Sequence, residues 1–392
     1  MHRILPQNPI AKDDLSKIVP ESLEQYRSRG GYDGLLRALD LGPNAIQELI
    51  KDAGLRGRGG AGFPTHIKWQ ALSEVTGEKY LVVNGAEGEP GAFKDRYLMT
   101  SAPHQVLEGI IITGLALGVS EVIFYINDHF DEAIGALKAS ITEFQRMPWN
   151  GDGRIGFEVR LVPETHVYIA GEETALISVL NGGPAQPWRK PPYPTTQGYH
   201  GKPTVVNNVE TMAHVALILR TSAEWYRENR PALFSVDGDV ALPGVYELPL
   251  GTSLENLLVK AGGDQIQRVL PGGYSMPWLE PEDYQVALDY DALKAHGTGL
   301  GASIICLGSK RDLAVVTNDI MTFFARETCG KCPLCVRGTA MLAEMLRPKG
   351  ALLAPEEVEQ IVSKAQKYRH KGICTYMDTA VHMAEMAAPS LS

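Results

Sequence analysis

Apolar residues recur at two different spacings along the first half of the chain, and each spacing predicts a different element. In residues 1–55, leucines and isoleucines recur every three or four positions among charged residues, which is typical of amphipathic helices. Short apolar runs at 80–84, 121–126 and 157–162 predict buried strands, and a longer apolar pattern at 105–118 predicts a helix between the first two. Strands that alternate with helices in this way predict a mainly parallel sheet covered by helices.

The pattern changes after the sheet region. In residues 232–302, glycines and prolines interrupt short strand-like runs, which predicts a small, turn-rich α+β module. From residue 312 onward helical spacing returns on both sides of a group of cysteines. We therefore expect an α/β chain of four parts. They are an N-terminal helical segment (1–55), a parallel-sheet domain (56–230), an inserted α+β module (231–305) and a helical domain (306–392).

The composition narrows the class of protein. The 392 residues include 46 Asp and Glu against 37 Lys and Arg, a formal net charge of -9, which argues against a broad nucleic-acid-binding surface. No apolar run is long enough to cross a bilayer, and the N-terminus has no apolar signal-peptide core. We expect a cytoplasmic protein without membrane insertion, either free or on the cytoplasmic side of a membrane complex.

Four of the five cysteines have the spacing of a metal centre. Cys329, Cys332 and Cys335 form a C-x2-C-x2-C run, and Cys374 follows at a distance. Iron–sulfur clusters are commonly held by such a run and one remote cysteine. A zinc site, which usually shows two C-x2-C pairs or cysteine with histidine, is the weaker alternative. Cys306 lies in an apolar strand-like run and is expected to be a small buried residue.

Basic residues surround the cysteine run. Arg326, Lys331, Arg337 and Lys371 are its neighbours in the sequence. They could offset the negative charge of a thiolate cluster, or they could form an ordinary solvated basic surface.

A glycine-rich loop suggests an anion site. Gly57, Gly59 and Gly62 match G-x-G-x-x-G, but the run follows a helical pattern, whereas a dinucleotide-binding turn should follow a strand. Two neighbouring arginines, Lys68 and successive glycine amides nevertheless favour a phosphate or a flat ring close to the backbone.

Further polar loops follow predicted strands. The loops at 84–91 and 168–174 each carry two glutamates, and carboxylates hydrogen-bond well to ribose hydroxyls and to amide groups. Asn207 and Asn208 add donors and acceptors at the start of a helix. Paired glutamates could instead serve a hydrolase, but nothing else in the chain builds a sugar or peptide site. The run at 190–194 (KPPYP) is a stiff turn that either presents an aromatic face or is merely structural.

Together these motifs resemble the flavin-binding NADH dehydrogenase subunit of respiratory complex I and the diaphorase subunits of NAD-linked hydrogenases and formate dehydrogenases. The resemblance covers about residues 30–384. GLRGRGGAGFPTHIKW is similar to the family's flavin loop and NGAEGEPGAFKDR to its acidic loop. YIAGEETALI, KPPYP and TVVNNVET are similar to its other nucleotide-site segments. ETCGKCPLC and the later Cys374 are similar to its [4Fe–4S] ligands, and GDVALPGVYELPLGTSL is similar to its β-grasp module.

The resemblance implies a Rossmann-like FMN-binding domain, an inserted β-grasp (soluble-ligand-binding) module and a C-terminal helical bundle with the cluster. It implies an NADH:acceptor oxidoreductase that exchanges hydride between NAD(H) and FMN and passes single electrons to the [4Fe–4S] cluster. We expect no thioredoxin-like extension of the kind that some relatives carry. The implied partners are therefore a thioredoxin-like [2Fe–2S] subunit and a further iron–sulfur or catalytic subunit of a larger redox complex.

The resemblance also implies roles for individual residues. The cofactor-binding residues would be Gly57, Gly59, Gly60, Lys68, Asn84, Tyr168, Gly171, Asn207 and Asn208. Glu89, Glu172 and Glu173 would line the flavin–NADH pocket as its catalytic residues, with Phe63, Lys190 and Tyr193 facing the adenosine half. The cluster ligands would be Cys329, Cys332, Cys335 and Cys374. No side chain need act as an acid or a base, so catalysis would rest on positioning.

Two departures from the family pattern leave alternatives open. Ala86 stands where the family usually has aspartate, and Ala71 stands where an aromatic residue is common. These positions allow a flavin and iron–sulfur relay subunit without nucleotide turnover. A zinc-stabilised nucleotide-binding module is a third reading. The motifs do not distinguish NAD from NADP, or the direction of electron flow.

Overall fold

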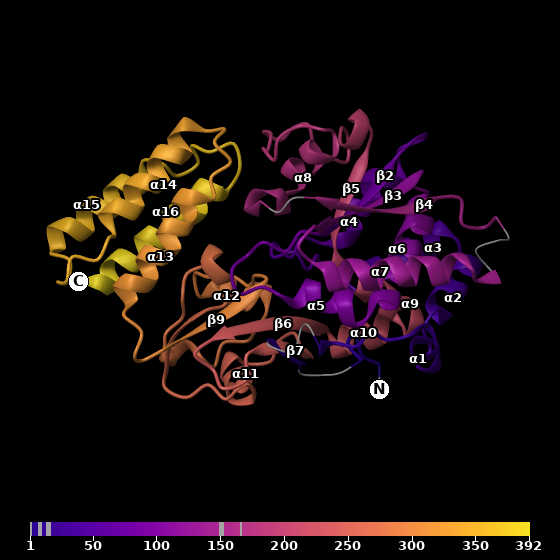
Figure 1. Ribbon diagram of the computed structural model, residues 1–392, viewed down its shortest axis with the longest axis horizontal. Coiled ribbons are helices and arrows are strands. Elements are labelled where there is room, and N and C mark those ends of the chain that lie inside the picture. The colour runs from indigo at the N-terminus through magenta and orange to yellow at the C-terminus, as the bar shows by residue number, and fades with distance from the viewer. Residues whose placement is uncertain (1, 7–9, 13–16, 149–152, 165–166) are drawn as a thin grey trace.

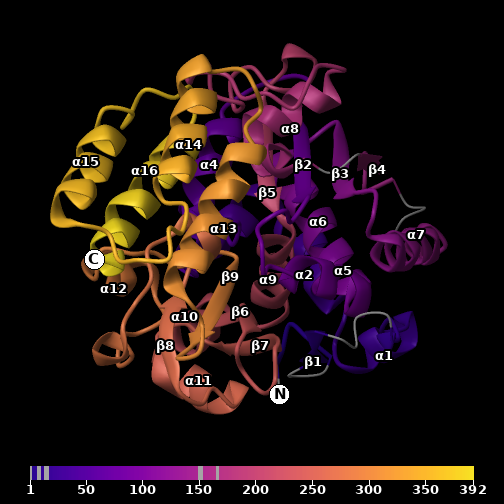
Figure 2. The same cartoon turned by 60° about the vertical axis from the view of Figure 1, so that its left-hand side comes forward.

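The computed structural model describes residues 2–6, 10–12, 17–148, 153–164 and 167–392, and these form three bodies that meet near the centre of the molecule (Figure 1). A parallel-sheet domain lies on one side, a second sheet lies below it, and four C-terminal helices form the opposite end (Figures 1 and 2).

The first sheet has four strands, all parallel, in the order β4-β3-β2-β5. Its strands are β2 (Tyr80–Gly85), β3 (Glu121–Asn127), β4 (Glu158–Glu164) and β5 (Thr204–Asn208). The predicted parallel α/β sheet is confirmed. Because side chains alternate along β2, Leu81 and Val83 enter the large core while Tyr80 and Val82 pack on the opposite face. Both faces are therefore covered, as in other parallel sheets.

Helices cover both faces. One face carries α6 (Pro103–Leu117) and α9 (Val209–Arg220), with α2 (Asp33–Leu41) and α3 (Pro43–Asp52) outside them. Also in this domain are α1 (Leu23–Ser28), α4 (Thr65–Ser73), α5 (Lys94–Ser101), α7 (Asp131–Gln145), α8 (Glu173–Leu180) and α10 (Ala223–Asn229). The backbones of α6 and α9 approach closely at Gly109, where an added Cβ would lie 1.7 Å from the Met212 carbonyl oxygen.

The second sheet has the order β1-β7-β6-β9-β8, with β6 parallel to β9 and the other pairs antiparallel. Its strands are β1 (Ile10–Ala11), β6 (Pro231–Gly238), β7 (Gly244–Pro249), β8 (Ile266–Leu270) and β9 (Ser303–Gly308), and it carries α11 (Leu254–Ala261) and α12 (Tyr290–Ala295). Most of this α+β arrangement lies within the expected range 231–305, but β9 continues past that boundary to Gly308, and β1 comes from the N-terminal part of the chain. Cys306 lies on β9 and is buried, as predicted.

The expectation of a wholly helical N-terminus is wrong for part of residues 1–55, and another part lies outside the described residues. Residues 10–11 form β1, which extends the second sheet by pairing with β7. The backbone amides of Ile4 and Leu5 donate to the Glu247 carboxylate. These tertiary contacts replace helical hydrogen bonds, and three prolines within the first 20 residues disfavour a continuous helix.

The predicted C-terminal helices are confirmed. They are α13 (Leu313–Arg326), α14 (Pro333–Met345), α15 (Pro355–Gln366) and α16 (Tyr376–Ala387), which share a core of their own (Figure 2). Among the described helices of the chain, none combines the length and the apolar character needed to cross a membrane.

Candidate functional site

Three of the predicted motifs meet at the carboxyl edge of the parallel sheet. Asn84, at the end of β2, donates from its Nδ2 to the Gly171 carbonyl oxygen at 2.9 Å. Asn207, near the end of β5, accepts from the indole Nε1 of Trp69 at 3.0 Å. Ligands of open α/β sheets bind at this edge, where loops and helix N-termini converge. Trp69 was not among the predicted site residues.

The glycine-rich loop lies against the same edge, between α3 and α4. A Cβ added at Gly59 would contact the Asn208 Cβ at 3.4 Å, so the loop runs beside the start of α9. Gly60 has φ +112°, and a Cβ there or at Gly171 would meet no atom within 4 Å. The backbone is thus open on this side, with Lys68 nearby. These features fit a flat, anionic cofactor such as FMN, which needs bare backbone, amide donors and positive charge.

Four predicted side chains form one ionic group beside the loop. Lys68 Nζ lies 2.8 Å from Glu173 Oε2, and Lys190 Nζ lies 2.5 Å from Glu173 Oε1 and 3.2 Å from Glu172 Oε1. Burial alone would raise the pKa of Glu173, but the two lysines outweigh it and lower that pKa. Glu172 also accepts from the amides of Thr174 and Ala175 and so caps α8. The structure therefore uses Glu172 partly to fix the loop.

The two predicted aromatic residues extend outward from the site. Phe63 and Tyr193 are 45% and 55% exposed as whole residues. Each lies on a loop, within a few residues of one of the paired lysines in the sequence. Exposed rings at such positions are available to stack on a base or to contact a partner.

Glu89 lies at the junction of the three bodies. It is held by hydrogen bonds from Tyr168 Oη at 2.6 Å and from the Ser275 amide at 3.2 Å, with Ser275 Oγ also within bonding distance. Burial raises the pKa of Glu89. Ser275 follows β8 in the second sheet and was not predicted. The only sequence signal close to Ser275 is the Gly272–Gly273 pair. In the structure this pair lies against Glu89, since a Cβ added at Gly273 would lie 2.8 Å from Glu89 Oε1.

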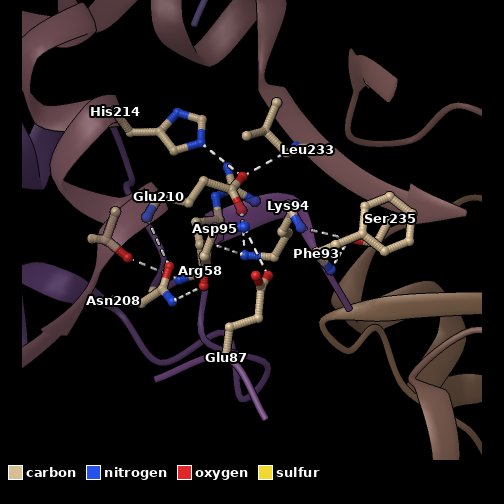
Figure 3. Close-up of polar contacts among 12 residues, drawn as sticks. Arg58, Glu87, Phe93, Lys94, Asp95, Asn208, Glu210, His214, Leu233 and Ser235 are labelled. Carbon is tan, nitrogen blue, oxygen red and sulfur yellow. Dashed lines mark hydrogen bonds and ion pairs between the residues drawn. The ribbon is translucent and has the colours of Figure 1, made fainter. Parts of the chain in front are cut away.

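A buried charged cluster supports the site from behind (Figure 3). Lys94 Nζ lies 2.7 Å from Asp95 Oδ1 and 2.8 Å from Glu210 Oε2. Asp95 also accepts from Asn208 Nδ2 at 2.6 Å, so a predicted cofactor residue is tied to this cluster. Burial would lower the pKa of Lys94, but the neighbouring carboxylates outweigh it and raise that pKa. The ammonium therefore stays charged and holds the carboxylates in place.

Glu87 and Arg58 complete the buried cluster. Glu87 accepts from the amides of Asp95 and Arg96 at 2.7 and 2.8 Å, so it caps the start of α5. Burial and the Asp95 carboxylate raise the pKa of Glu87 to about 7. Arg58 is buried and donates to Tyr226 Oη at 3.1 Å. Sequence reasoning missed this cluster because its members are distant in sequence.

The four predicted cluster cysteines line one cavity. Cys329, Cys332, Cys335 and Cys374 surround it together with Ile169 of the turn Tyr168–Gly171 (η3). Within the described part of the chain, no three His, Cys, Asp or Glu side chains converge on a single-ion site. Three cysteines at two-residue spacing and one remote cysteine around a single cavity are the donor set of an iron–sulfur cluster rather than of a zinc site.

The thiols in the cysteine cavity require a nearby positive charge to ionise near neutral pH. Burial and the neighbouring cysteines raise the pKa of the Cys335 thiol to about 12. The cationic charge of bound metal would ionise such thiols near neutral pH. The surrounding chain holds the loop in place, because Gln186 Nε2 donates to the Cys329 carbonyl oxygen at 3.0 Å and Lys331 Nζ to the Pro187 carbonyl oxygen at 2.7 Å.

The fold and the site define a class: a parallel α/β domain with a flat-cofactor site at its sheet edge, joined to a helical domain with an iron–sulfur cavity. Comparison with known proteins gives the family. Residues 50–217 match the family model described as the Nuo51 FMN-binding domain. Residues 315–389 match the model of the NADH-ubiquinone oxidoreductase-F iron-sulfur binding region.

Similar proteins come from respiratory and hydrogenase complexes. A subunit of the NADH-quinone oxidoreductase of Rhizobium meliloti (strain 1021) is 38% identical over 343 residues, which are 83% of this chain and 82% of that protein. NADP-reducing hydrogenase subunit HndC of Solidesulfovibrio fructosivorans is 36% identical over 354 residues, 86% of this chain and 72% of that protein. A crystal structure of an NAD+-reducing [NiFe]-hydrogenase in the air-oxidized state matches with TM-score 0.81 and 32% identity, over 89% of this chain and 63% of that one.

This chain belongs to the family of NADH-quinone oxidoreductase subunits that carry the Nuo51 FMN-binding domain. The resemblance seen in the motifs, the α/β fold class and the cofactors FMN and [4Fe–4S] are confirmed. The family consists of oxidoreductase subunits of larger complexes that carry electrons from NADH through FMN to the cluster.

Proposed function

We propose that this chain is the NADH-oxidising, or NAD-reducing, subunit of a multi-subunit redox complex, and that its two cofactors communicate through the turn Tyr168–Gly171. One observation carries the proposal. Gly171 accepts from Asn84 at the sheet edge, while Ile169, two residues earlier, lines the cysteine cavity. A single short turn thus borders both the flavin site and the cluster site.

The loops at the sheet edge would hold FMN. We assign Gly57, Gly59, Gly60, Lys68, Asn84, Tyr168, Gly171, Asn207 and Asn208 to its binding. Lys68 supplies positive charge, the glycines leave the backbone open, and the asparagines fix the loops. Bound flavin supplies the conversion between the two-electron chemistry of nicotinamide and the one-electron chemistry of a cluster.

The ionic group beside the flavin site would position the nucleotide. Glu173 is held as a carboxylate by Lys68 and Lys190, and so it can accept hydrogen bonds from ribose or nicotinamide amide groups. The exposed rings of Phe63 and Tyr193 would face the adenosine half. Glu89, whose carboxylate is already occupied by Tyr168 and Ser275, would border this pocket and hold its wall.

The wider setting is also a proposal. Electrons leaving the cluster would pass to a thioredoxin-like [2Fe–2S] subunit or to a further iron–sulfur or catalytic subunit. We place the chain in the cytoplasm, either free or on the cytoplasmic side of a membrane complex. The formal net charge of -9 disfavours contact with nucleic acid.

Anaerobic titration of the reconstituted protein tests the proposal. NADH, and separately NADPH, is added while flavin absorbance is followed, and iron and acid-labile sulfide are measured on the same sample. We expect near-stoichiometric bleaching by NADH. Bleaching by dithionite but by neither nucleotide would instead establish a relay subunit. Zinc in place of iron and sulfide would overturn the redox assignment altogether.

A further inference from the structure

Positive charge is concentrated around the cysteines. The two cysteine-bearing segments, 326–337 and 364–374, contain seven Lys and Arg but a single Glu, a formal charge of +6. Because the whole chain carries -9, all other residues together carry -15. Two further carboxylates, Asp378 and Glu385, contact the second segment and lower the local excess from +6 to +4. This local positive charge in an acidic chain makes the surface potential uneven, which steers charged partners.

Part of this positive charge is already used inside the molecule. Arg326 pairs with Glu327, Arg369 pairs with Glu385, and Lys331 donates to a carbonyl oxygen. Arg337, Lys367 and Lys371 are exposed, and no ion pair joins them to any described residue. These three cations therefore do not serve to neutralise carboxylates among the described residues.

The three exposed cations come from two segments that meet beside the cluster cavity. Tyr368 packs on α14 at Gly338, where an added Cβ would lie 2.8 Å from the ring, so the loop after α15 lies beside Arg337. Lys371 directly precedes Gly372, which lines the cysteine cavity. Leu334, between two of the cysteines, is 51% exposed. We call Arg337, Lys367, Lys371 and Leu334 the basic rim.

We propose that the basic rim is the docking surface for an acidic one-electron carrier protein, which exchanges electrons with the cluster. The inference rests on the proposed function, since it assumes that electrons leave or enter through the cluster. Weak redox encounters have small interfaces, in which complementary charge sets the encounter rate and the orientation of the partners. An acidic partner is attracted to the rim and repelled by the rest of this acidic chain, so it would approach the cluster in preference to other surfaces.

Binding of two small carrier proteins of opposite charge tests the rim. The probes are an acidic plant-type [2Fe–2S] ferredoxin and a basic cytochrome c, titrated calorimetrically into the holoprotein. We expect the ferredoxin to bind, with affinity falling about tenfold between about 20 and about 300 mM salt, because screening weakens attraction between exposed charges. The double variant Lys367→Glu, Lys371→Glu should weaken ferredoxin binding at least about tenfold at low salt.

A matched variant separates the rim from net charge. Lys138→Glu with Lys260→Glu makes the same charge change on α7 and α11, away from the cysteines (Figure 1), and should change ferredoxin affinity less than about twofold. Equal effects of the two double variants, or tighter binding of cytochrome c than of ferredoxin, would overturn the proposal and leave a solvated basic surface. Flavin bleaching by NADH is recorded on the same samples. Its absence from the unaltered protein would refute the proposed function, whereas the binding data would still decide the docking surface.

Discussion

Cys306 and Cys335 are both buried thiols, and burial raises the pKa of each to about 12. They differ in their neighbours, because the pKa of Cys306 is raised further by Asp237 and Asp239, whereas that of Cys335 is raised by three other cysteines. Cys335→Ala should therefore remove the cluster, lowering iron from about four atoms per chain towards zero. Cys306→Ala should retain the full iron content, because alanine keeps a small apolar side chain on β9. Iron and sulfide analysis with EPR of the reduced protein measures both. Equal iron in the two variants would contradict the ligand assignment.

Glu87 should make stability depend on pH. Its carboxyl faces Asp95 and Lys94, and the wider cluster holds three carboxylates (Glu87, Asp95, Glu210) against two cations (Arg58, Lys94). The charges of these five groups therefore balance when one of the three carboxylates is protonated. Since the pKa of Glu87 is raised to about 7, the folded state binds more protons than the unfolded state above pH 4.5 or so.

The direction in which stability changes with pH follows from this difference in proton binding. The free energy of unfolding should fall as pH rises from about 5 to about 7 and level off above, by about 1 to 2 kcal/mol for a half-buried group. Glu87→Gln should flatten this slope in urea titrations of the apoprotein at several pH values. Glu48→Gln, at an exposed i,i+3 pair on α3, should leave the slope intact. If Glu87→Gln left the slope of unfolding free energy against pH unchanged, the proton would be bound by a group other than Glu87.

At the scale of elements, the contact between α6 and α9 depends on one glycine. A Cβ at Gly109 would lie 1.7 Å from the Met212 carbonyl oxygen, so Gly109→Ala must push the helices apart. We expect the free energy of unfolding to fall by about 3 kcal/mol or more. Gly135→Ala on α7, where an added Cβ meets no atom within 4 Å, should instead stabilise by about 0.5 to 1 kcal/mol through helix propensity. Chemical denaturation measures the free energy of unfolding of both variants. Equal destabilisation by the two would show that the close approach of α6 and α9 does not exclude a side chain at residue 109.

Local pattern was enough to predict β2, the helix that starts after Asn208 and the helices around the cysteines, but β5, which carries Asn207 and Asn208, was not predicted as a strand. The apolar run at 80–84 and the cysteine spacing each indicate their structure within a few residues. β1 could not be predicted in this way, because only its pairing with β7 makes residues 10–11 a strand. The links from Glu89 to Ser275 and from Asp95 to Asn208 span 186 and 113 residues, so they depend on tertiary contact. Sequence therefore predicted the motifs at the site but not the residues that hold them in place.

At the scale of the whole molecule, Glu89, Tyr168 and Ser275 join the three bodies. Glu89 belongs to the parallel-sheet domain and Ser275 to the second sheet. Tyr168 bonds both residues and packs edge-on against Phe323 and Tyr376 of the helical domain. Tyr376 in turn lines the cysteine cavity. Relative placement of the flavin and cluster sites therefore depends on this junction.

Ser275→Ala should loosen the junction without unfolding any one body. Glu89 would keep its bonds from Tyr168 and from the residue 275 amide but lose the hydroxyl, at a cost of about 1 to 2 kcal/mol. Because Glu89 and Tyr168 lie between the bodies, we expect faster amide hydrogen exchange at residues 84–91 and in η3, with the interiors of α6 and α9 unchanged. Ser309→Ala, on an exposed serine after β9, is the matched control. Faster exchange throughout the second sheet in Ser275→Ala would mean that the hydroxyl stabilises that sheet alone. Exchange confined to 84–91 and η3 would establish that the second sheet positions the loops between the two cofactors.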